Sequence, residues 1–381
     1  SFLQFLRPGC ILQFDDILLA QKAFPTGSEP FLTVAIPHYK HVRYLALVLE
    51  SIFEQQYQDF EILVSNDHSP DDSDEVVPGL LADSGCCFRY YSQPHNLGYD
   101  GNVRFCLAAA QGRYVMLLGN DDALAGPTVL QELETALHKL DLPDVAVTNY
   151  ADWQSGQIVQ RALSTHVVGR GYDTAIRFYR SFSFVSGLIY DRAHALAHET
   201  DRWDRSVYYQ MYIGARLIAA DGRLGTINLV TVRKDVHIDG QGVPNYQTKA
   251  RGAKWSFASR STGVASVLRV TWDGVQPYIP ARDKSKAVRR IIGQAYLTLH
   301  PYWILEYRRI ANWSYGVGVA RGHWPGKLLA EYDLDLQDRL YLWVLYTGVT
   351  LIALIMPVDL FNSIKFRLAH FVRILQQSRS L

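Results

Sequence analysis

The segment YVMLLGNDDAL, residues 114–124, joins an apolar run to two adjacent carboxylates, Asp121 and Asp122. The apolar run predicts a buried strand over 113–119, so both carboxylates stand where that strand ends. Neighbouring negative charges repel each other, and a cation beside them relieves that cost. Carboxylate oxygens are hard ligands that suit Mg²⁺ or Mn²⁺ bound together with a diphosphate. We therefore expect a divalent metal at this strand end, with helix capping as the alternative interpretation.

Strand-like and helix-like segments alternate on both sides of this stretch. Apolar runs predict strands, and apolar spacing of three and four predicts helices. The strands are expected at 31–36, 60–65, 88–93, 113–119 and 144–150, and the helices at 44–56, 74–81, 103–110 and 127–140. This order predicts an α/β fold with a mainly parallel sheet. Ligands of such sheets bind beyond the carboxyl ends of the strands.

The composition excludes several other classes of protein. The chain has 381 residues, of which 48% are hydrophobic and 12% aromatic, so it is neither disordered nor collagen-like. Its four cysteines show no metal-binding spacing, which favours a reducing compartment.

Three more predicted strand ends carry polar or glycine-rich segments. They are TVAIPHY (33–39), FEILVSNDHSPDDS (60–73) and HNLGYDGN (95–102). Asp67 follows the second strand, and Gly98 and Gly101 allow the backbone to approach a ligand closely. Taken singly, Asp67 could be a helix cap and HNLGYDGN an ordinary turn. Four such segments in this order favour a shared binding site.

Together the four segments resemble the motifs of a family 2 glycosyltransferase with the GT-A (Rossmann-like) fold. That family has a first strand ending in Pro-x-Tyr or Pro-x-Asn, an Asp-Asp-Gly-Ser type motif, an Asn-x-Gly segment and an Asp-x-Asp type metal motif. The matching residues here are Pro37 and Tyr39, Asn66-Asp67-His68-Ser69, Asn96 and Gly98, and Asn120-Asp121-Asp122. The resemblance covers roughly residues 31–240. Asn66 and Asn120 replace the first acid of their motifs, which leaves the nucleotide base uncertain.

The resemblance implies inverting transfer of a sugar from a nucleotide-sugar donor, with a UDP-sugar favoured. Donor-binding residues would be Pro37, His38, Tyr39, Asp67, Asn96, Gly98, Asn102 and Asp121. Asp122 would bind Mg²⁺ or Mn²⁺, and His237 resembles a histidine that joins the metal in many relatives. A lone histidine is also commonly structural.

The reaction needs a carboxylate that takes the proton of the acceptor hydroxyl. The family's usual Glu-Asp pair is missing from the expected window, HETDRWDRSVYYQ (198–210). Asp204 is the first candidate for the base and Asp201 the second, and surface charge is the alternative for both. Ser186 and Gly187 resemble the family's acceptor loop, although they could form a plain turn into a strand.

The C-terminal part differs from the rest in charge and pattern. Residues 1–240 carry a net charge of −10 and residues 241–381 a net charge of +11. Residues 340–358 contain no charged residue, and a basic amphipathic pattern follows through Phe361, Ile364, Leu368, Phe371 and Leu375. These features predict a membrane-inserting segment and a helix on anionic lipid, with a buried core helix as the alternative.

The expected regions are an N-terminal helical extension (1–30), a GT-A catalytic domain (31–240), a helical basic region (241–339) and a membrane-inserting segment with an amphipathic helix (340–381). We expect an enzyme at the cytoplasmic face of the cell inner membrane, contacting membrane lipids and a lipid-linked or glycan acceptor. The alternative is a non-catalytic nucleotide-sugar-binding scaffold subunit of a glycan assembly. A nucleic-acid partner is not expected, because a long uncharged stretch does not suit such a surface.

Overall fold

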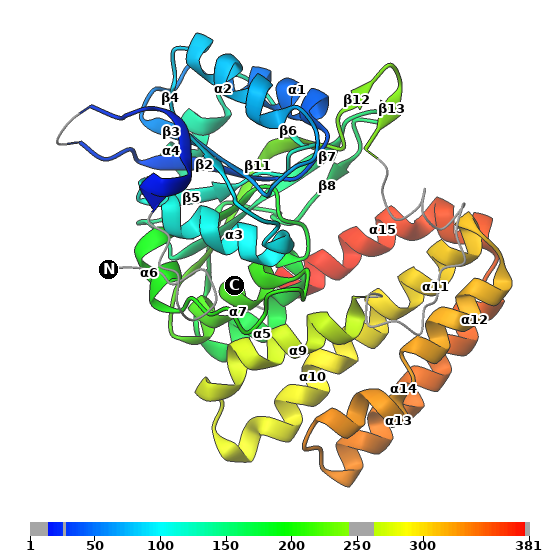
Figure 1. Ribbon diagram of the computed structural model, residues 1–381. Coiled ribbons are helices and arrows are strands. Elements are labelled where there is room, and N and C mark those ends of the chain that lie inside the picture. Colours follow the sequence, from blue (N-terminus) through cyan, green and yellow to red (C-terminus); the bar gives the residue numbers. More distant parts are fainter. Residues whose placement is uncertain (1–13, 26–27, 244–262, 378–381) are drawn as a thin grey trace.

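The computed structural model describes residues 14–25, 28–243 and 263–377. Within these residues an eleven-stranded sheet forms the upper half of the molecule in Figure 1. Its neighbouring strands β4 (Cys87–Ser92), β3 (Phe60–Asn66), β2 (Leu32–His38) and β5 (Tyr114–Leu117) are all parallel. The expected α/β fold with a parallel centre is confirmed.

The sheet continues past β5 with a change of direction. β10 (Leu188–Asp191) lies antiparallel between β5 and β7 (Val145–Asp152), and β11 (Leu224–Lys234) runs parallel to β7. Short strands complete this side: β6 (Ala123–Leu124), β8 (Ile158–Val159) and β9 (His166–Gly169). A separate hairpin pairs β12 (His237–Ile238) with β13 (Gln241–Gly242).

Helices cover both faces of the sheet because the central strands are apolar on both sides. Leu32, Val34 and Ile36 of β2 pack into one core, and Ala35 packs into the other. The first core is covered by α1 (Val42–Phe53), α2 (Ser73–Asp83) and α4 (Val129–Lys139). The second is covered by α3 (Gly98–Ala109), α5 (Gly171–Phe178) and α7 (Tyr209–Ala219), with α6 (Arg192–Ala197) nearby. All strands and helices expected between 31 and 150 are present.

The expected helix near the N-terminus is wrong in its described part. Phe14–Ile17 form a single 3-10 turn, and Leu18–Lys22 form β1, which pairs antiparallel with β4. The physical reason is the open edge of β4, whose backbone groups are satisfied when this segment adds as a strand. Residues 1–13 lie outside the described residues.

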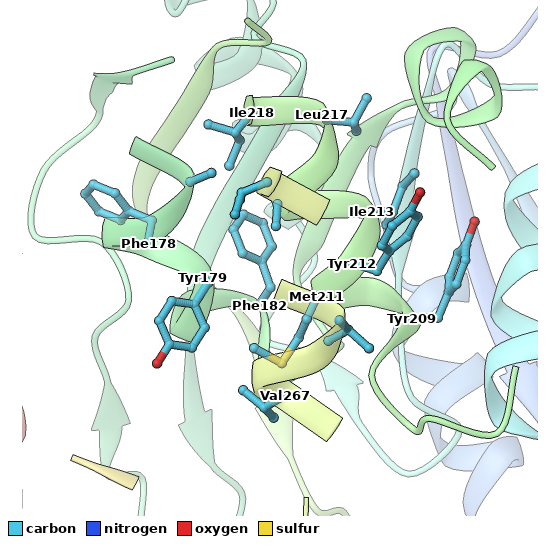
Figure 2. Close-up of a cluster of buried hydrophobic side chains, with 14 of the residues drawn as sticks. Phe178, Tyr179, Phe182, Tyr209, Met211, Tyr212, Ile213, Leu217, Ile218 and Val267 are labelled. Carbon is cyan, nitrogen blue, oxygen red and sulfur yellow. The ribbon is translucent and has the colours of Figure 1, made fainter. Parts of the chain in front are cut away.

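A helical bundle follows the sheet, as expected. It contains α9 (Val264–Val275), α10 (Lys284–Leu297), α11 (Leu299–Ile310), α12 (Trp313–Gly322), α13 (Pro325–Leu328), α14 (Leu336–Ile355) and α15 (Val358–Gln377). The hydrophobic core is continuous with the sheet half: Figure 2 shows Phe182 and Met211 close to Val267 of α9. The bundle is therefore packed against the sheet domain rather than tethered to it.

Helix α14 buries one side and exposes the other. Leu342, Tyr346 and Ala353 are buried, whereas Val344 is 74% and Ile355 77% exposed. Among the described residues it is the one helix long and apolar enough to cross a membrane, and 22% of its apolar window is buried. Helix α14 therefore contributes one side to the core and leaves the other side uncovered by the described residues.

Candidate active site

A cavity of about 480 Å³ opens at the carboxyl ends of the parallel strands. Every residue expected to bind the donor lies in its lining, together with Asp122: Pro37, His38, Tyr39, Asp67, Asn96, Gly98, Asn102 and Asp121. Parallel strands end at a common edge, so segments far apart in sequence meet there. The four segments therefore converge on one cavity in this fold, as expected.

Asp67 links the second strand end to the glycine-rich segment. Its two carboxylate oxygens accept hydrogen bonds from the backbone N–H groups of Leu97 (2.6 Å) and Gly98 (3.0 Å), at the start of α3. The Asn96 side chain donates to the Asp67 carbonyl oxygen at 3.0 Å. Burial raises the pKa of Asp67 to about 6, although both backbone bonds oppose this. Asp67 thus caps a helix and also lines the cavity.

The two asparagines that depart from the family pattern have partners that an aspartate could not serve. Asn120 Nδ2 donates to His38 Nδ1 (2.9 Å) and to the Lys40 carbonyl oxygen (3.0 Å). Asn66 Nδ2 donates to an oxygen of Asp74 at 2.8 Å. A carboxylate at either position would offer no donor. Both replacements are therefore consistent with an intact site.

His38 is a buried, neutral member of a hydrogen-bond chain. Because Nδ1 accepts from Asn120, Nε2 carries the proton and donates to Ser73 Oγ at 2.8 Å. Ser73 in turn donates to Asp71. Burial lowers the pKa of His38 to about 4. These hydrogen bonds hold the His38 side chain in place at the end of β2, in the lining of the cavity.

Asn102 has one side-chain atom without a partner. Its Nδ2 donates to the Ser65 carbonyl oxygen at 3.0 Å, whereas its Oδ1 is buried with no hydrogen-bond donor among the described residues. A buried acceptor without a donor is costly. Because Asn102 lines the cavity, a ligand donor at this position would remove the cost.

Three carboxylates gather in the cavity: Asp121, Asp122 and Asp235. Asp122 accepts hydrogen bonds from the Asp235 backbone N–H (2.8 Å) and from the Ser186 hydroxyl. Ser186 Oγ also accepts from the Gly119 backbone N–H at 2.8 Å, so Ser186 fixes Asp122. Burial and the neighbouring Asp121 raise the pKa of Asp122 to about 7.

This arrangement fits a divalent cation that is shared with a ligand. Within the described ranges, no three histidine, cysteine or acidic side chains converge closely enough to hold a metal by themselves. Mg²⁺ in proteins is commonly held by one or two carboxylates together with substrate phosphates. Burial raises the pKa of both Asp121 and Asp122, and a neighbouring carboxylate adds to each shift, Asp235 for Asp121 and Asp121 for Asp122, which suits a cation between them.

Several residues of the site were not singled out from sequence. Tyr99, Phe184, Val185 and Asp235 also line the cavity. Asp235 immediately follows β11, so the rule applied to the other strand ends would have found it. Arg161 lies behind the lining, where Nε, Nη1 and Nη2 donate to the carbonyl oxygens of Thr148 (2.6 Å), Phe184 (2.9 Å) and Ser186 (2.7 Å). No local pattern marks such a residue.

The structure does not bring the remaining expected residues into the lining. Asp204 forms a bidentate ion pair with Arg104 of α3, at 3.0 and 2.9 Å, and Asp201 is exposed. His237 lies on β12 with a buried Nδ1 that has no partner among the described residues. Gly187 has φ +77°, and a Cβ there would lie 2.5 Å from Thr148 Oγ1, which supports the turn interpretation.

Comparison with known proteins identifies similar sequences and folds. Residues 33–182 match the family described as Glycosyl transferase family 2. A β-1,3-glucosyltransferase of Campylobacter jejuni, named for GalNAc(5)-diNAcBac-PP-undecaprenol, is 35% identical over 95 residues, which are 25% of this chain and 31% of that protein. The abequosyltransferase RfbV of Salmonella typhimurium is 27% identical over 191 residues, covering 48% of this chain and 57% of that protein. The alignments thus span less than two thirds of either relative.

Solved structures share the fold. TarS 1-349 of S. aureus in complex with UDP has a TM-score of 0.54 at 12% identity, covering 88% of this chain and 91% of that one. The GT-A fold expected from the motifs is confirmed.

Proposed function

We propose that this chain, whose residues 33–182 belong to glycosyl transferase family 2, transfers a sugar from a nucleotide-sugar to a lipid-linked or glycan acceptor. One observation carries the proposal: every residue predicted to bind the donor lines a single cavity, together with Asp122 of the metal motif. The family match concerns the sequence, and the cavity shows that the matched segments converge in three dimensions.

The donor, with a UDP-sugar favoured, would bind across the strand ends. Tyr39 is 42% exposed at the cavity and offers a ring on which the base can stack. Asn102 Oδ1 supplies an acceptor for a hydroxyl or N–H group of the nucleoside. Asp67 and Asn96 hold the loop that carries Gly98, whose lack of a side chain lets the ligand approach the backbone.

Asp121 and Asp122 would hold Mg²⁺ or Mn²⁺ jointly with the donor diphosphate, and His237 stays a predicted contributor. When bound, the cation neutralises the charge that grows on the leaving diphosphate. Ser186 and Arg161 keep Asp122 and the 184–186 segment in place for that role.

Inversion at the anomeric carbon requires a base on the acceptor side. Asp204 and Asp201 stay predictions for this role, but Asp204 is paired with Arg104 and lies outside the lining. We favour Asp235, because it lines the cavity. Its carboxylate would take the proton of the attacking hydroxyl in a single displacement.

The proposed location is the cytoplasmic face of the cell inner membrane. Exposed apolar side chains of α14 form one stripe: Leu340, Tyr341, Val344, Leu351, Ile352 and Ile355. α15 exposes Leu360, Leu368 and Phe371 as well. Such faces, with basic residues nearby, suit partial insertion among lipid headgroups. The opposite side of α14 packs on α10 and α11, which favours lying at the surface over spanning it.

Binding of donors by the purified chain tests this proposal. We expect one nucleotide-sugar from a panel of UDP-, GDP- and dTDP-sugars to bind by calorimetry, and Asn102→Ala to weaken it. Asn362→Ala, at an asparagine on α15, is the matched control. Binding without turnover in the presence of membrane lipid extract would favour the scaffold alternative, and no binding at all would refute the donor site.

A further inference from the structure

The order of the strands indicates where the acceptor lies relative to the donor. Tyr39, Asp67 and Asn96 follow β2, β3 and β4, and Asp122 follows β5. The sheet continues from β5 through β10 and β7 to β11, and Asp235, the favoured base, follows β11. Because the base must reach the acceptor hydroxyl, we expect the acceptor at the ends of β7 and β11.

Trp153 is the first residue after β7, at this edge of the sheet. β7 and β11 run parallel, with Asp152 opposite Lys234. The Trp153 backbone N–H donates to the Lys234 carbonyl oxygen at 2.9 Å, so the two strand ends stay joined beyond their last paired residues. Asp235 is the next residue after Lys234 and lines the cavity. Trp153 thus contacts the residue that precedes the proposed base, just outside the cavity lining.

The Trp153 ring is exposed, and the turn that carries it is well ordered. Trp153 is 37% exposed, and the Arg233 guanidinium lies 5.9 Å from its ring centroid. Asp152 Oδ1 accepts hydrogen bonds from the Ser155 backbone N–H (2.8 Å) and hydroxyl (2.6 Å), and the Asp152 carbonyl oxygen accepts from the Gly156 N–H (2.9 Å). An aromatic ring that is already oriented loses little conformational freedom when a ligand binds to it.

Charged groups lie around this ring. Arg233 is exposed beside it, and Lys234 is ion-paired with Asp235. Lys234 Nζ also lies 6.0 Å from the ring centroid of Phe184, which lines the cavity. A purely apolar ligand would remove water from these charges at a cost in free energy. A pyranose instead offers C–H groups to the aromatic ring and hydroxyl groups to the charged side chains, the combination that ligand sites usually recognise.

We propose that Trp153 and Arg233 form an acceptor subsite in which a pyranose ring of the acceptor stacks on Trp153 next to Asp235. Trp153 would supply the stacking surface, and Arg233 would donate a hydrogen bond to a hydroxyl of the sugar. The inference rests on the proposed function and adds which part of the acceptor this edge recognises, namely a sugar ring. The attacking hydroxyl would then lie at the end of β11, where the proposed base lies.

Saturation-transfer NMR with soluble sugars tests the subsite. The probes are the methyl pyranosides of glucose, galactose, mannose and N-acetylglucosamine, added to the purified chain with Mg²⁺ and the nucleoside diphosphate of the donor that it binds. We expect at least one pyranoside to bind the wild type, and Trp153→Ala to weaken this binding by about tenfold, the loss of a stacked ring. Trp153→Phe keeps an aromatic ring and should weaken the binding by less than about threefold.

The matched control is Trp313→Ala. Trp313 is another exposed tryptophan, 58% exposed, at the start of α12 in the helical bundle. This variant should bind the pyranoside as the wild type does. Absence of pyranoside binding by the wild type, or equal losses in Trp153→Ala and Trp313→Ala, would overturn the subsite.

Vesicles of phosphatidylglycerol distinguish a sugar site from a lipid-binding surface. Trp153→Ala should bind these vesicles as the wild type does, because the ring is assigned to the sugar. Weaker vesicle binding by Trp153→Ala, with unchanged pyranoside binding, would overturn the subsite and assign Trp153 to the lipid surface.

Affinity for the donor separates this inference from the proposed function. Unchanged donor binding by Trp153→Ala would show that the fold and the donor site are intact, so that a loss of pyranoside binding supports the subsite. A parallel fall in donor affinity would overturn the acceptor assignment, because the ring would then contribute to the donor site. Failure of the wild type to bind any nucleotide-sugar would refute the proposed function instead.

Discussion

The cavity and the outer face of the helical bundle differ in the kind of group that lacks a partner within the structure. In the cavity, polar groups lack partners: Asn102 Oδ1 has no donor, and Asp122 is buried beside other carboxylates. In the bundle, apolar groups lack cover: Val344, Ile352 and Ile355 of α14 are each more than half exposed. Some polar groups inside the bundle are paired, as in the hydrogen bond between the His300 and His323 rings at 2.9 Å, whereas Thr271 Oγ1 and His323 Nε2 are buried without a partner among the described residues.

This difference indicates what each region binds. Unsatisfied buried polar atoms lower their free energy by contacting a polar or charged ligand. Uncovered apolar side chains lower theirs by leaving water. The first region therefore fits a nucleotide-sugar with a cation, and the second fits a lipid surface.

Substitution of the candidate bases, Asp235 and Asp204, one at a time gives the largest expected effect on turnover. Asp235→Asn should lower the release of nucleoside diphosphate by about 10²- to 10⁴-fold, the usual contribution of a general base. Asp204→Asn should leave turnover nearly unchanged and lower the free energy of unfolding by about 1–3 kcal/mol, because buried Arg104 loses a charged partner. Steady-state kinetics and urea unfolding measure the two effects. The reverse pattern would restore Asp204 as the base.

An acidic residue on the exposed face of α14 should weaken the binding of that face to lipid. Val344→Asp or Ile352→Asp should weaken binding to anionic vesicles by about tenfold each, since each removes an apolar side chain from the contact. Val76→Asp makes the same change on α2, where Val76 is 36% exposed, and should have no such effect. Co-sedimentation with vesicles measures this. Equal binding by all variants would show that α14 does not face the lipid.

Asp67 of the cavity and His300 of the bundle should make stability depend on pH with opposite sign. Burial raises the pKa of Asp67 from 3.8 to about 6, so the folded state binds the proton more tightly and stability falls as pH rises through this window. Burial lowers the pKa of His300 from 6.5 to about 3, so the unfolded state binds the proton more tightly and stability falls as pH drops below 6.5.

Each of these groups contributes at most about 1.4 kcal/mol per pH unit to the slope. In urea unfolding between pH 4 and 8, Asp67→Asn should reduce the loss of stability on raising pH, and His300→Gln should reduce the loss on lowering it. If the free energy of unfolding of either variant depended on pH as in the wild type, that residue would not be a cause of the pH dependence.

The residues that line the cavity could be predicted because the pattern that marks them, a polar residue at the end of an apolar strand, lies within a short stretch of sequence. A strand that ends in a polar residue places that residue at the shared edge of the sheet, so the position of Tyr39, Asp67 and Asp122 at one cavity could be predicted without knowing the sheet order. The edge strand β1 was not predictable, since its conformation depends on pairing with β4. The Arg104 and Asp204 pair likewise joins residues a hundred positions apart, which no local pattern contains. The hydrogen bonds of Arg373 with Gln160 and Ser181 depend on where α15 docks, which its amphipathic pattern does not show.

Release of nucleoside diphosphate tests the central claim most directly. It should be measured over a panel of sugar nucleotides, with Mn²⁺ or Mg²⁺ against EDTA, for the wild type, Asp122→Ala and the exposed control Asp83→Ala. We predict metal-dependent release from one donor in the wild type and in Asp83→Ala. In Asp122→Ala, release should fall by about 10²- to 10³-fold, as expected for lost electrostatic stabilisation. Release that is unaffected by both EDTA and Asp122→Ala would contradict the account.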